Sequence, residues 1–266
     1  MNNMEFIVLA SGSKGNATYL EIGNEKILID CGLSFKQINE RLAEKGKTLE
    51  GLSKVFITHE HSDHVSQLSM LAKKHDFDIY LSEGTLSHLN KKIRFVIDSR
   101  RFKVMLPEEF IEFDGFKVLP FMVYHDAFEP FGYRFFEGDK SFVYMTDTGY
   151  FPLRKHHLIS NAEAYVIESN HEVEMLLESN RPWLLKRRIL DDQGHLSNED
   201  SANLLLDLAG DKTRVIILAH LSEECNVESK ALDAYNKVFL EQGVDIYSYS
   251  IIVAKQNYST EIISVE

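Results

Sequence analysis

The sequence predicts one α/β domain over residues 1–266, built from two mixed β-sheets with helices on their outer faces. Short apolar runs alternate with helix-period segments in both halves of the chain, which favours layered sheets and helices. No Pro-rich or Ser-rich linker and no low-complexity stretch divides the chain, and single α/β units of this size are common. Apolar residues make up 44% and charged residues 26%, which is enough apolar material for a sizeable core.

The first half is predicted to contain strands and helices separated by Gly, Ser and Asn turns. Strands are predicted at residues 5–10, 18–22, 26–30, 54–58 and 78–81. Helices are predicted at residues 34–45, 65–74 and 83–90, with Ser34 as the N-cap of the first and Gly46 after its end. Residues 102–141 are predicted to be rich in strands that turns such as Asp114-Gly115 interrupt.

The second half continues the same alternation. Strands are predicted at residues 142–146, 164–168, 214–218, 244–249 and 258–263. Helices are predicted at residues 173–179, 182–191, 197–209 and 227–242. The pattern fits two sheets packed face to face with helices outside better than two separate domains.

Charge and cysteine content narrow the class of protein. A net charge of −12 argues against coating nucleic acid through a broad basic surface, although bound divalent cations would add positive charge that this count omits. Cys31 and Cys225 are too few for a disulfide framework. The first residues lack the pattern of a signal peptide, and no apolar run is long enough for a membrane span. We therefore expect a cytoplasmic protein without a membrane partner.

The main chemical signal is the run Thr58-His59-Glu60-His61-Ser62-Asp63-His64, directly after an apolar strand. A loop at a strand end lets neighbouring side chains point in different directions, so one run of ligands can serve two metals. Imidazole and carboxylate groups suit zinc, and also manganese or iron. The alternative is a histidine-rich surface loop, which the spacing and the later ligands disfavour.

Three later residues occupy equivalent positions, because each follows a run of apolar or β-branched residues. They are His125 in Val123-Tyr124-His125, Asp147 in Met145-Thr146-Asp147, and His220 in Leu218-Ala219-His220. Taken singly, such a residue is more often a cap or a satisfied polar group than a metal ligand. Together with the histidine run, they complete a set of metal ligands.

With these residues the sequence resembles the metallo-β-lactamase superfamily over nearly its whole length, which implies a four-layer αββα sandwich. The resemblance implies two divalent metal ions, held by His59, His61 and His125 for the first, by Asp63, His64 and His220 for the second, and by Asp147 for both. Asp30 in Ile29-Asp30-Cys31 matches the aspartate that supports the histidine loop from outside the metal shell. A hydroxide bridging the metals is the expected nucleophile, and Asp63, Asp147 and His195 are the expected catalytic residues.

The spacing between ligands disfavours several branches of the superfamily. Glyoxalase-II enzymes add a helical domain after the last histidine, but 46 residues follow His220 here. Nucleases with an inserted domain need a longer chain between Asp147 and His220. The tRNA-processing enzymes carry a protruding arm between the equivalents of His125 and Asp147, where this chain has 21 residues. Secreted β-lactamases carry an export signal and usually lack the bridging aspartate.

Gly194-His195-Leu196-Ser197 is similar to the histidine segment that phosphodiesterase branches place beside the metals. There the histidine contacts a phosphate oxygen or protonates the leaving group, a task that suits imidazole because its pKa lies near the working pH. The alternative interpretation is a surface histidine ahead of Ser197 as an N-cap.

The glycine-rich segment Ser11-Gly12-Ser13-Lys14-Gly15-Asn16 could turn backbone N–H groups and a lysine toward an anion, although a tight hairpin explains it equally well. With Asp30-Cys31-Gly32-Leu33 and Glu168-Ser169-Asn170-His171-Glu172, it is similar to the YycJ (WalJ) group, which implies a stand-alone, cytoplasmic, metal-dependent 5′-to-3′ DNA exonuclease. The residues expected to bind substrate are Ser11, Ser13, Lys14, Asn16, His171 and His195. His171 could equally cap the next helix.

Other candidate strand contacts are weaker. Trp183 with Lys186, Arg187 and Arg188 could form a stacking and cationic patch, as could a second basic stretch over residues 91–103, but solvated helix faces explain both more simply. Phe128, Phe131 and Tyr133 could shape a pocket rim, although aromatic residues near a strand are more often core.

The leading hypothesis is a metal-dependent phosphodiesterase, specifically a DNA exonuclease. The alternatives are a hydrolase of a small cyclic phosphodiester or of a thioester, and a weakly active regulatory metalloprotein that acts through a partner. The sequence leaves open whether the metal is zinc, manganese or iron, whether DNA or RNA is cut and with which polarity, and the oligomeric state.

Overall fold

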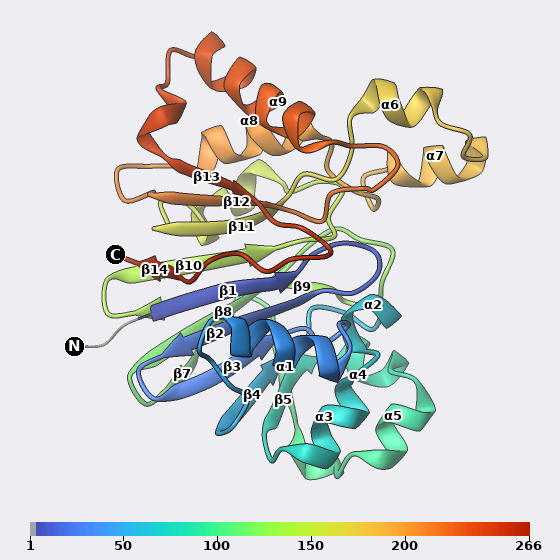
Figure 1. Cartoon of the computed structure of the whole chain (residues 1–266), viewed down its shortest axis with the longest axis vertical. Helices are drawn as coiled ribbons and strands as arrows, with labels where there is room; N and C mark the ends of the chain where they lie inside the picture. Colours follow the sequence, from blue (N-terminus) through green and yellow to red (C-terminus); the bar gives the residue numbers. More distant parts are fainter. Residues whose placement is uncertain (1–3) are drawn as a thin grey trace. The chain divides into compact units, whose positions relative to one another are not determined.

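The computed structural model describes residues 4–266, and the chain divides into two compact units (Figure 1). Unit 1 holds the chain up to Met122 together with Ala127–Asp139 and Lys255–Glu266. Unit 2 holds Val123–Asp126 and Lys140–Ala254. The prediction of a single domain over the whole chain stays a prediction.

Unit 1 contains a mixed sheet with the strand order β14-β1-β2-β3-β4-β5-β6. The neighbours from β14 to β3 are antiparallel, and those from β3 to β6 are parallel. The strands are β1 (Met4–Ala10), β2 (Ala17–Ile22), β3 (Glu25–Ile29), β4 (Leu52–Phe56), β5 (Asp78–Ser82), β6 (Phe102–Met105) and β14 (Ile263–Val265). Three further strands form an antiparallel set: β7 (Ile111–Phe113), β8 (Phe116–Met122) and β9 (Phe131–Glu137).

The helices of unit 1 cover one face of its first sheet (Figure 1). They are α1 (Phe35–Glu44), α2 (Ser62–Val65), α3 (Leu68–Lys74), α4 (Glu83–His88), α5 (Lys91–Val96) and the 3-10 helix η1 (Ser99–Arg101). Ser34 caps α1 as predicted, because its side chain accepts a hydrogen bond from the Gln37 N–H. Leu42 of α1 and Leu71 of α3 join Val55 of β4 in one buried cluster, which anchors the helices on the sheet.

The other face of the sheet packs on β7 and β9 through aromatic side chains. Phe56 of β4 is fully buried and stacks on Tyr80 of β5, with 4.8 Å between ring centroids. Its ring also lies edge-on to Tyr133 and Phe135 of β9, at 5.4 and 5.2 Å, and to Phe113 of β7 at 6.3 Å. Because β4 leads directly into the histidine run, this packing fixes where that run begins.

Unit 2 contains four parallel strands, β10 (Lys140–Met145), β11 (Ala164–Glu168), β12 (Val215–Ala219) and β13 (Ser250–Val253). Its helices are η2 (Leu153–Leu158), α6 (Val173–Glu178), α7 (Trp183–Ile189), α8 (Asn198–Leu208), α9 (Glu228–Glu241) and η3 (Ile246–Ser248). The Ser201 hydroxyl joins three elements, since it lies on α8, donates to the Glu168 carbonyl of β11 and lies 2.6 Å from the Tyr235 hydroxyl of α9.

Two predictions of secondary structure near the C-terminus are wrong. Residues 246–248 form η3 rather than a strand, because the Asp245 carboxylate accepts the Tyr247 N–H and closes a tight turn. The last strand begins at Ile263 instead of spanning residues 258–263, since Thr260 exchanges hydrogen bonds with the Val8 backbone as an irregular segment. Helix α5 was not predicted, and the helix predicted over residues 65–74 begins at Leu68 as α3, after the separate short helix α2.

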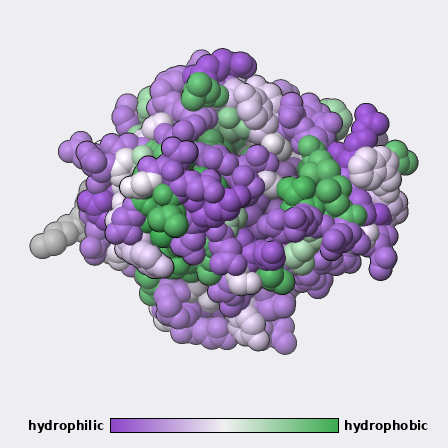
Figure 2. Space-filling view, turned by 90° about the horizontal axis from the view of Figure 1, so that it is seen from above, coloured by the Kyte–Doolittle hydropathy of each residue, from purple (hydrophilic) through white to green (hydrophobic). Residues whose placement is uncertain are grey.

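Within residues 4–266, the structure has no helix that is both long and apolar enough to cross a membrane. The face drawn in Figure 2 is mostly hydrophilic and interrupted by separate hydrophobic patches. Cys31 and Cys225 are both buried as free thiols.

We predict that Phe56→Ala lowers the free energy of unfolding by about 3–5 kcal/mol, because it removes a buried ring that four other aromatic residues contact. Urea denaturation followed by circular dichroism measures the change. Phe95→Ala is the matched control, since Phe95 is 92% exposed and its loss should change stability by less than about 0.5 kcal/mol. Equal effects of the two substitutions would contradict this account of the core.

Candidate metal centre

The histidine run of unit 1 follows β4 and continues into α2, and it brings three imidazole rings together. The His59 ring centroid lies 4.6 Å from that of His61 and 4.1 Å from that of His64. His59 and His64 are buried, while His61 and Asp63 are partly exposed. Imidazoles this close together, next to a carboxylate, are a donor set that suits a divalent transition metal.

Asp30 fixes the position of the histidine run through contacts of its side chain with Thr58 and His64. Its fully buried carboxylate accepts hydrogen bonds from the Thr58 N–H at 2.9 Å and from the Thr58 hydroxyl, and lies 2.7 Å from His64 Nδ1. A carboxylate at Nδ1 fixes the proton there, which leaves His64 Nε2 as the metal-binding atom. Burial raises the pKa of Asp30, and the adjacent His64 opposes that rise. The supporting role predicted for Asp30 fits this geometry.

The backbone brings the segment after β3 unusually close to the histidine loop. Asp30 has a φ of 59°, in the left-handed region that a non-glycine residue seldom adopts. A Cβ on Gly32 would lie 1.5 Å from the Asp63 carbonyl oxygen, so only glycine fits there. The Cys31 N–H donates to the His64 carbonyl at 2.7 Å. The Asp30-Cys31-Gly32 signature therefore holds the loop in place.

The segment Ser11–Asn16 borders the same loop, but its members are placed differently. Asn16 is fully buried, and its amide nitrogen lies 3.1 Å from His64 Nε2 and 3.4 Å from Asp63 Oδ2. Ser11 is buried as well, whereas Ser13 and Lys14 are exposed. Asn16 therefore lies where it can orient the ligands, while Ser13 and Lys14 can meet a solute.

In unit 2, two predicted ligands follow parallel strands on either side of β11, and their side chains lie close together. Asp147 follows β10 and His220 follows β12, and both have a φ of 55°. His220 Nδ1 lies 3.3 Å from Asp147 Oδ1, and His125 Nε2 lies 3.8 Å from the same oxygen. His125 Nδ1 lies 3.2 Å from the Gly194 carbonyl, and burial lowers the pKa of His125, which favours the neutral form that binds metals.

The structure adds Glu168, which sequence reasoning had not assigned to the site. It is the last residue of β11, fully buried, and accepts from the Thr148 N–H at 2.8 Å. Its Oε1 lies 2.7 Å from His195 Nδ1 and 2.9 Å from His220 Nδ1. Burial alone would raise the pKa of Glu168, but the two imidazoles outweigh it and hold the pKa at about 2. The available signal was its position at a strand end between Asp147 and His220.

Within unit 2, a donor atom from each of Asp147, Glu168, His195 and His220 lies within 4.8 Å of the others. This is a carboxylate and imidazole set of the kind that holds a divalent cation. Within this set Asp147 and His220 are the predicted ligands, while Glu168 holds the Nδ1 atoms of His195 and His220, as outer carboxylates do at metal sites.

His171 is a further buried imidazole in this unit. It is 1% exposed, and neither ring nitrogen has a hydrogen-bond partner among the residues that the structure describes. Burial lowers its pKa to about 4, so it is neutral at physiological pH. Its backbone carbonyl accepts from the Asn198 N–H at the start of α8, but its side chain caps no helix. A buried, unsatisfied imidazole is costly unless something binds to it.

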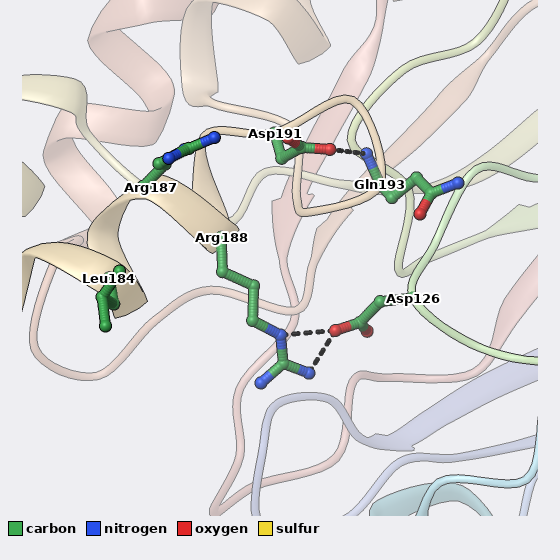
Figure 3. A pocket seen from close by; sticks show the side chains of 6 residues that line it. All are labelled: Asp126, Leu184, Arg187, Arg188, Asp191 and Gln193. Carbon is green, nitrogen blue, oxygen red and sulfur yellow. Dashed lines mark hydrogen bonds and ion pairs between the residues drawn. The ribbon is translucent and has the colours of Figure 1, made fainter.

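A pocket of about 310 Å³ opens between α7 and the segments carrying His125 and His195 (Figure 3). It is lined by Asp126, Leu184, Arg187, Arg188, Asp191 and Gln193. Arg188 pairs with Asp126 across it, as the dashed lines show. Lys186 is buried and donates to the carbonyls of Leu177 and Ser179. The cationic patch considered for α7 is therefore reduced mainly to Arg187.

Comparisons with known proteins agree with this geometry. Residues 25–221 match the family described as "Beta-lactamase superfamily domain". The chain is 43% identical over 250 residues to a protein named exodeoxyribonuclease WalJ from Streptococcus pneumoniae serotype 2 (strain D39 / NCTC 7466), with 92% of this chain and 93% of that protein covered. It is 38% identical over 243 residues to exodeoxyribonuclease YycJ from Bacillus anthracis, covering 91% and 92% of the two chains.

Solved structures show the same fold at low sequence identity. The metallo-β-lactamase fold protein YhfI from Bacillus subtilis aligns with a TM-score of 0.72 and 15% identity over 97% of this chain and 99% of that chain. Zn²⁺-bound PqqB from Methylobacterium extorquens aligns with a TM-score of 0.71 and 15% identity, over 97% and 100%. The predicted fold class, two mixed β-sheets flanked by helices, is confirmed, and so is the predicted resemblance.

We predict that Glu168→Gln weakens binding of a divalent metal by about 10- to 100-fold, because an amide oxygen is a poorer acceptor for both histidine Nδ1–H groups. Isothermal titration of the metal-stripped protein with zinc measures the affinity. Glu163→Gln is the matched control, since Glu163 is a buried carboxylate of the same unit that accepts from Ser141 and pairs with Lys212 instead. Equal losses in the two variants would show a general effect of removing a buried charge.

Proposed function

The chain belongs to the β-lactamase superfamily, and on this premise we propose that it is a metal-dependent phosphodiesterase that degrades DNA from a 5′ end. The observation that carries the proposal is His195, a partly exposed imidazole that the buried Glu168 carboxylate orients beside the ligands Asp147 and His220. The names of the relatives that match over nearly the whole chain support DNA as the substrate.

We propose that two divalent ions, of zinc, manganese or iron, bind to seven side chains: His59, His61, Asp63, His64, His125, Asp147 and His220. The donor chemistry supports this set, as do the carboxylates that fix His64 and His220 by their Nδ1 atoms. When bound, such ions polarise phosphate oxygens and make water a nucleophile near neutral pH. The catalytic role proposed for Asp63 and Asp147 is to bind these ions.

His195 is the residue we assign to the phosphate. Because Nδ1 faces Glu168, Nε2 is the atom that contacts a phosphate oxygen or gives a proton to the leaving oxygen. The side chain is 20% exposed, so a substrate can reach it. The predicted N-cap is Ser197 itself, whose hydroxyl accepts the Asp200 N–H, and this leaves His195 without a capping role.

Other residues are proposed to contact the strand. Ser13 and Lys14 are exposed next to the buried Asn16, and Lys14 brings a positive charge to phosphate. His171 is proposed as a contact because both nitrogen atoms of its buried imidazole are unsatisfied within the described part of the chain. Ser11 is proposed because it begins the segment that carries Ser13. We also propose that the protein works in the reducing cytoplasm, where buried free thiols such as Cys31 and Cys225 persist.

The proposed activity predicts that purified protein with manganese or zinc shortens end-labelled single-stranded DNA, and that a chelator abolishes this. Asp147→Ala should lower kcat/KM by more than about 100-fold, since it removes a ligand rather than an outer contact. Strands blocked at either the 5′ or the 3′ end report polarity, and only the 5′ block should protect. Turnover of an acyl-glutathione without cleavage of DNA or bis-p-nitrophenyl phosphate would instead establish a thioesterase.

The role of His195 predicts that His195→Ala lowers kcat on DNA by about 10²- to 10⁴-fold while the protein keeps its metal content. Stopped assays on labelled DNA give kcat, and elemental analysis of the same sample gives the metal. His156→Ala, on η2 of the same unit, is the control and should leave kcat unchanged. Loss of metal in the His195 variant would identify this residue as a ligand and refute a phosphate role.

A further inference from the structure

We propose that Phe128 of unit 1, backed by His88, is a stacking platform for one base of the DNA strand next to the histidine loop. The identity of the ligand rests on the proposed function. The position of the platform rests on the geometry of unit 1 alone.

Phe128 differs from the aromatic residues that follow it. Phe131 and Tyr133 are fully buried in the core, whereas Phe128 is 54% exposed. Its ring lies parallel to that of His88, with 3.3 Å between centroids and an interplanar angle of 0°. One face of the phenyl ring is therefore covered by the imidazole, while much of the side chain remains open to a ligand.

The loop that carries Phe128 is fastened to α4 by several hydrogen bonds. The Thr85 hydroxyl donates to the Phe128 carbonyl, and the Ser82 hydroxyl donates to the Glu129 carbonyl at 2.8 Å. The Gly84 N–H donates to the Glu129 carboxylate at 2.7 Å. A loop held this firmly presents its exposed ring at a fixed position, which lowers the entropic cost of binding.

The backbone of this loop is also constrained by a left-handed residue and by a close approach to Gly84. Glu129 has a φ of 59°, which costs a non-glycine residue conformational energy. A Cβ on Gly84 would lie 2.6 Å from the Glu129 Cβ and 2.8 Å from the Phe128 carbonyl oxygen, so this close approach needs glycine. Strained residues that surrounding contacts hold in place cluster at binding sites.

The loop is tied directly to the metal-binding run. The Phe128 N–H donates to the Glu60 carboxylate at 2.9 Å, and Glu60 lies between His59 and His61 in the chain. The Phe131 N–H donates to the Thr58 carbonyl at 2.9 Å, at the start of the same run. A base that stacks on Phe128 would therefore lie beside the predicted metal ligands of the histidine run.

Exposed cations lie on the helix that follows α4, where they can meet the phosphates of a strand that stacks on Phe128. Helix α5 follows α4 and carries three exposed cations, Lys91, Lys92 and Arg94. The Arg94 guanidinium donates to the Ser87 carbonyl, next to His88 in the chain. Stacking on an aromatic ring combined with cations for the phosphates is the usual way to bind single strands without sequence preference.

The test is a scan with single abasic sites along a single-stranded DNA substrate, read as kcat/KM. For the wild-type protein, one abasic position should lower kcat/KM by roughly 5- to 150-fold, the range that stacking of one base spans. Phe128→Ala should lose a similar factor on intact DNA and show no further loss at that position. Phe128→Trp should restore the positional effect, and Phe128→Leu should not, although it keeps apolar bulk.

Two controls separate stacking from structural support. Tyr247→Ala removes an aromatic residue that is 88% exposed in unit 2 and should leave the scan unchanged. Bis-p-nitrophenyl phosphate reports the metal centre without a strand, so its turnover should fall far less than that of DNA in Phe128→Ala. Thermal unfolding checks that each variant is folded.

A flat abasic scan in wild-type protein that cleaves DNA would overturn the platform and leave the proposed function intact. An equal loss on DNA and on the small phosphodiester in Phe128→Ala and Phe128→Leu would also overturn it, by showing that Phe128 supports the histidine loop. If the wild-type protein cleaves no DNA with any metal, the proposed function fails and the platform fails with it.

Discussion

Buried carboxylates that hold imidazoles by their Nδ1 atoms are the interaction on which the rest of the site depends. Asp30 holds His64 in unit 1, and Glu168 holds His195 and His220 in unit 2. Each carboxylate lies at the end of a buried strand, so its position is fixed by a sheet rather than by a flexible loop. The chain thus uses the same device twice, and each time it directs Nε2 atoms outward for binding.

Three residues of the candidate site have a strained backbone. Asp30, Asp147 and His220 all follow strands and all have a φ between 55° and 59°, where each costs about 1–3 kcal/mol. In each unit, the left-handed residue turns the chain directly after a strand and so ends the pleat of that strand. Packing such as that around Phe56 supplies the stability that offsets this strain.

Most of the fold could be predicted from the sequence, and apolar runs that end in His or Asp are a local pattern that also selects the candidate ligands, which stay a prediction. Glu168 could not be predicted as part of the site, because its partners His195 and His220 are distant in the chain. A glutamate at the end of a strand also has many other uses. The strand predicted over residues 244–249 failed for the opposite reason, since an aspartate cap overrode a suitable alternation. Phe128 resembles a core residue until the fold shows that Phe131 and Tyr133 fill the core and it does not.

A net charge of −12 constrains how such a protein can hold DNA. Two of the three candidate cations of α7 are already occupied, Lys186 by carbonyl groups and Arg188 by Asp126. A broad basic groove is therefore absent from α7 in the part of the chain that the structure describes. The proposed function draws its affinity from a few short-range contacts instead, namely divalent ions at phosphate, oriented imidazoles and the proposed stacked base. Such contacts read a strand locally, which suits an enzyme that needs to engage only the end of its substrate.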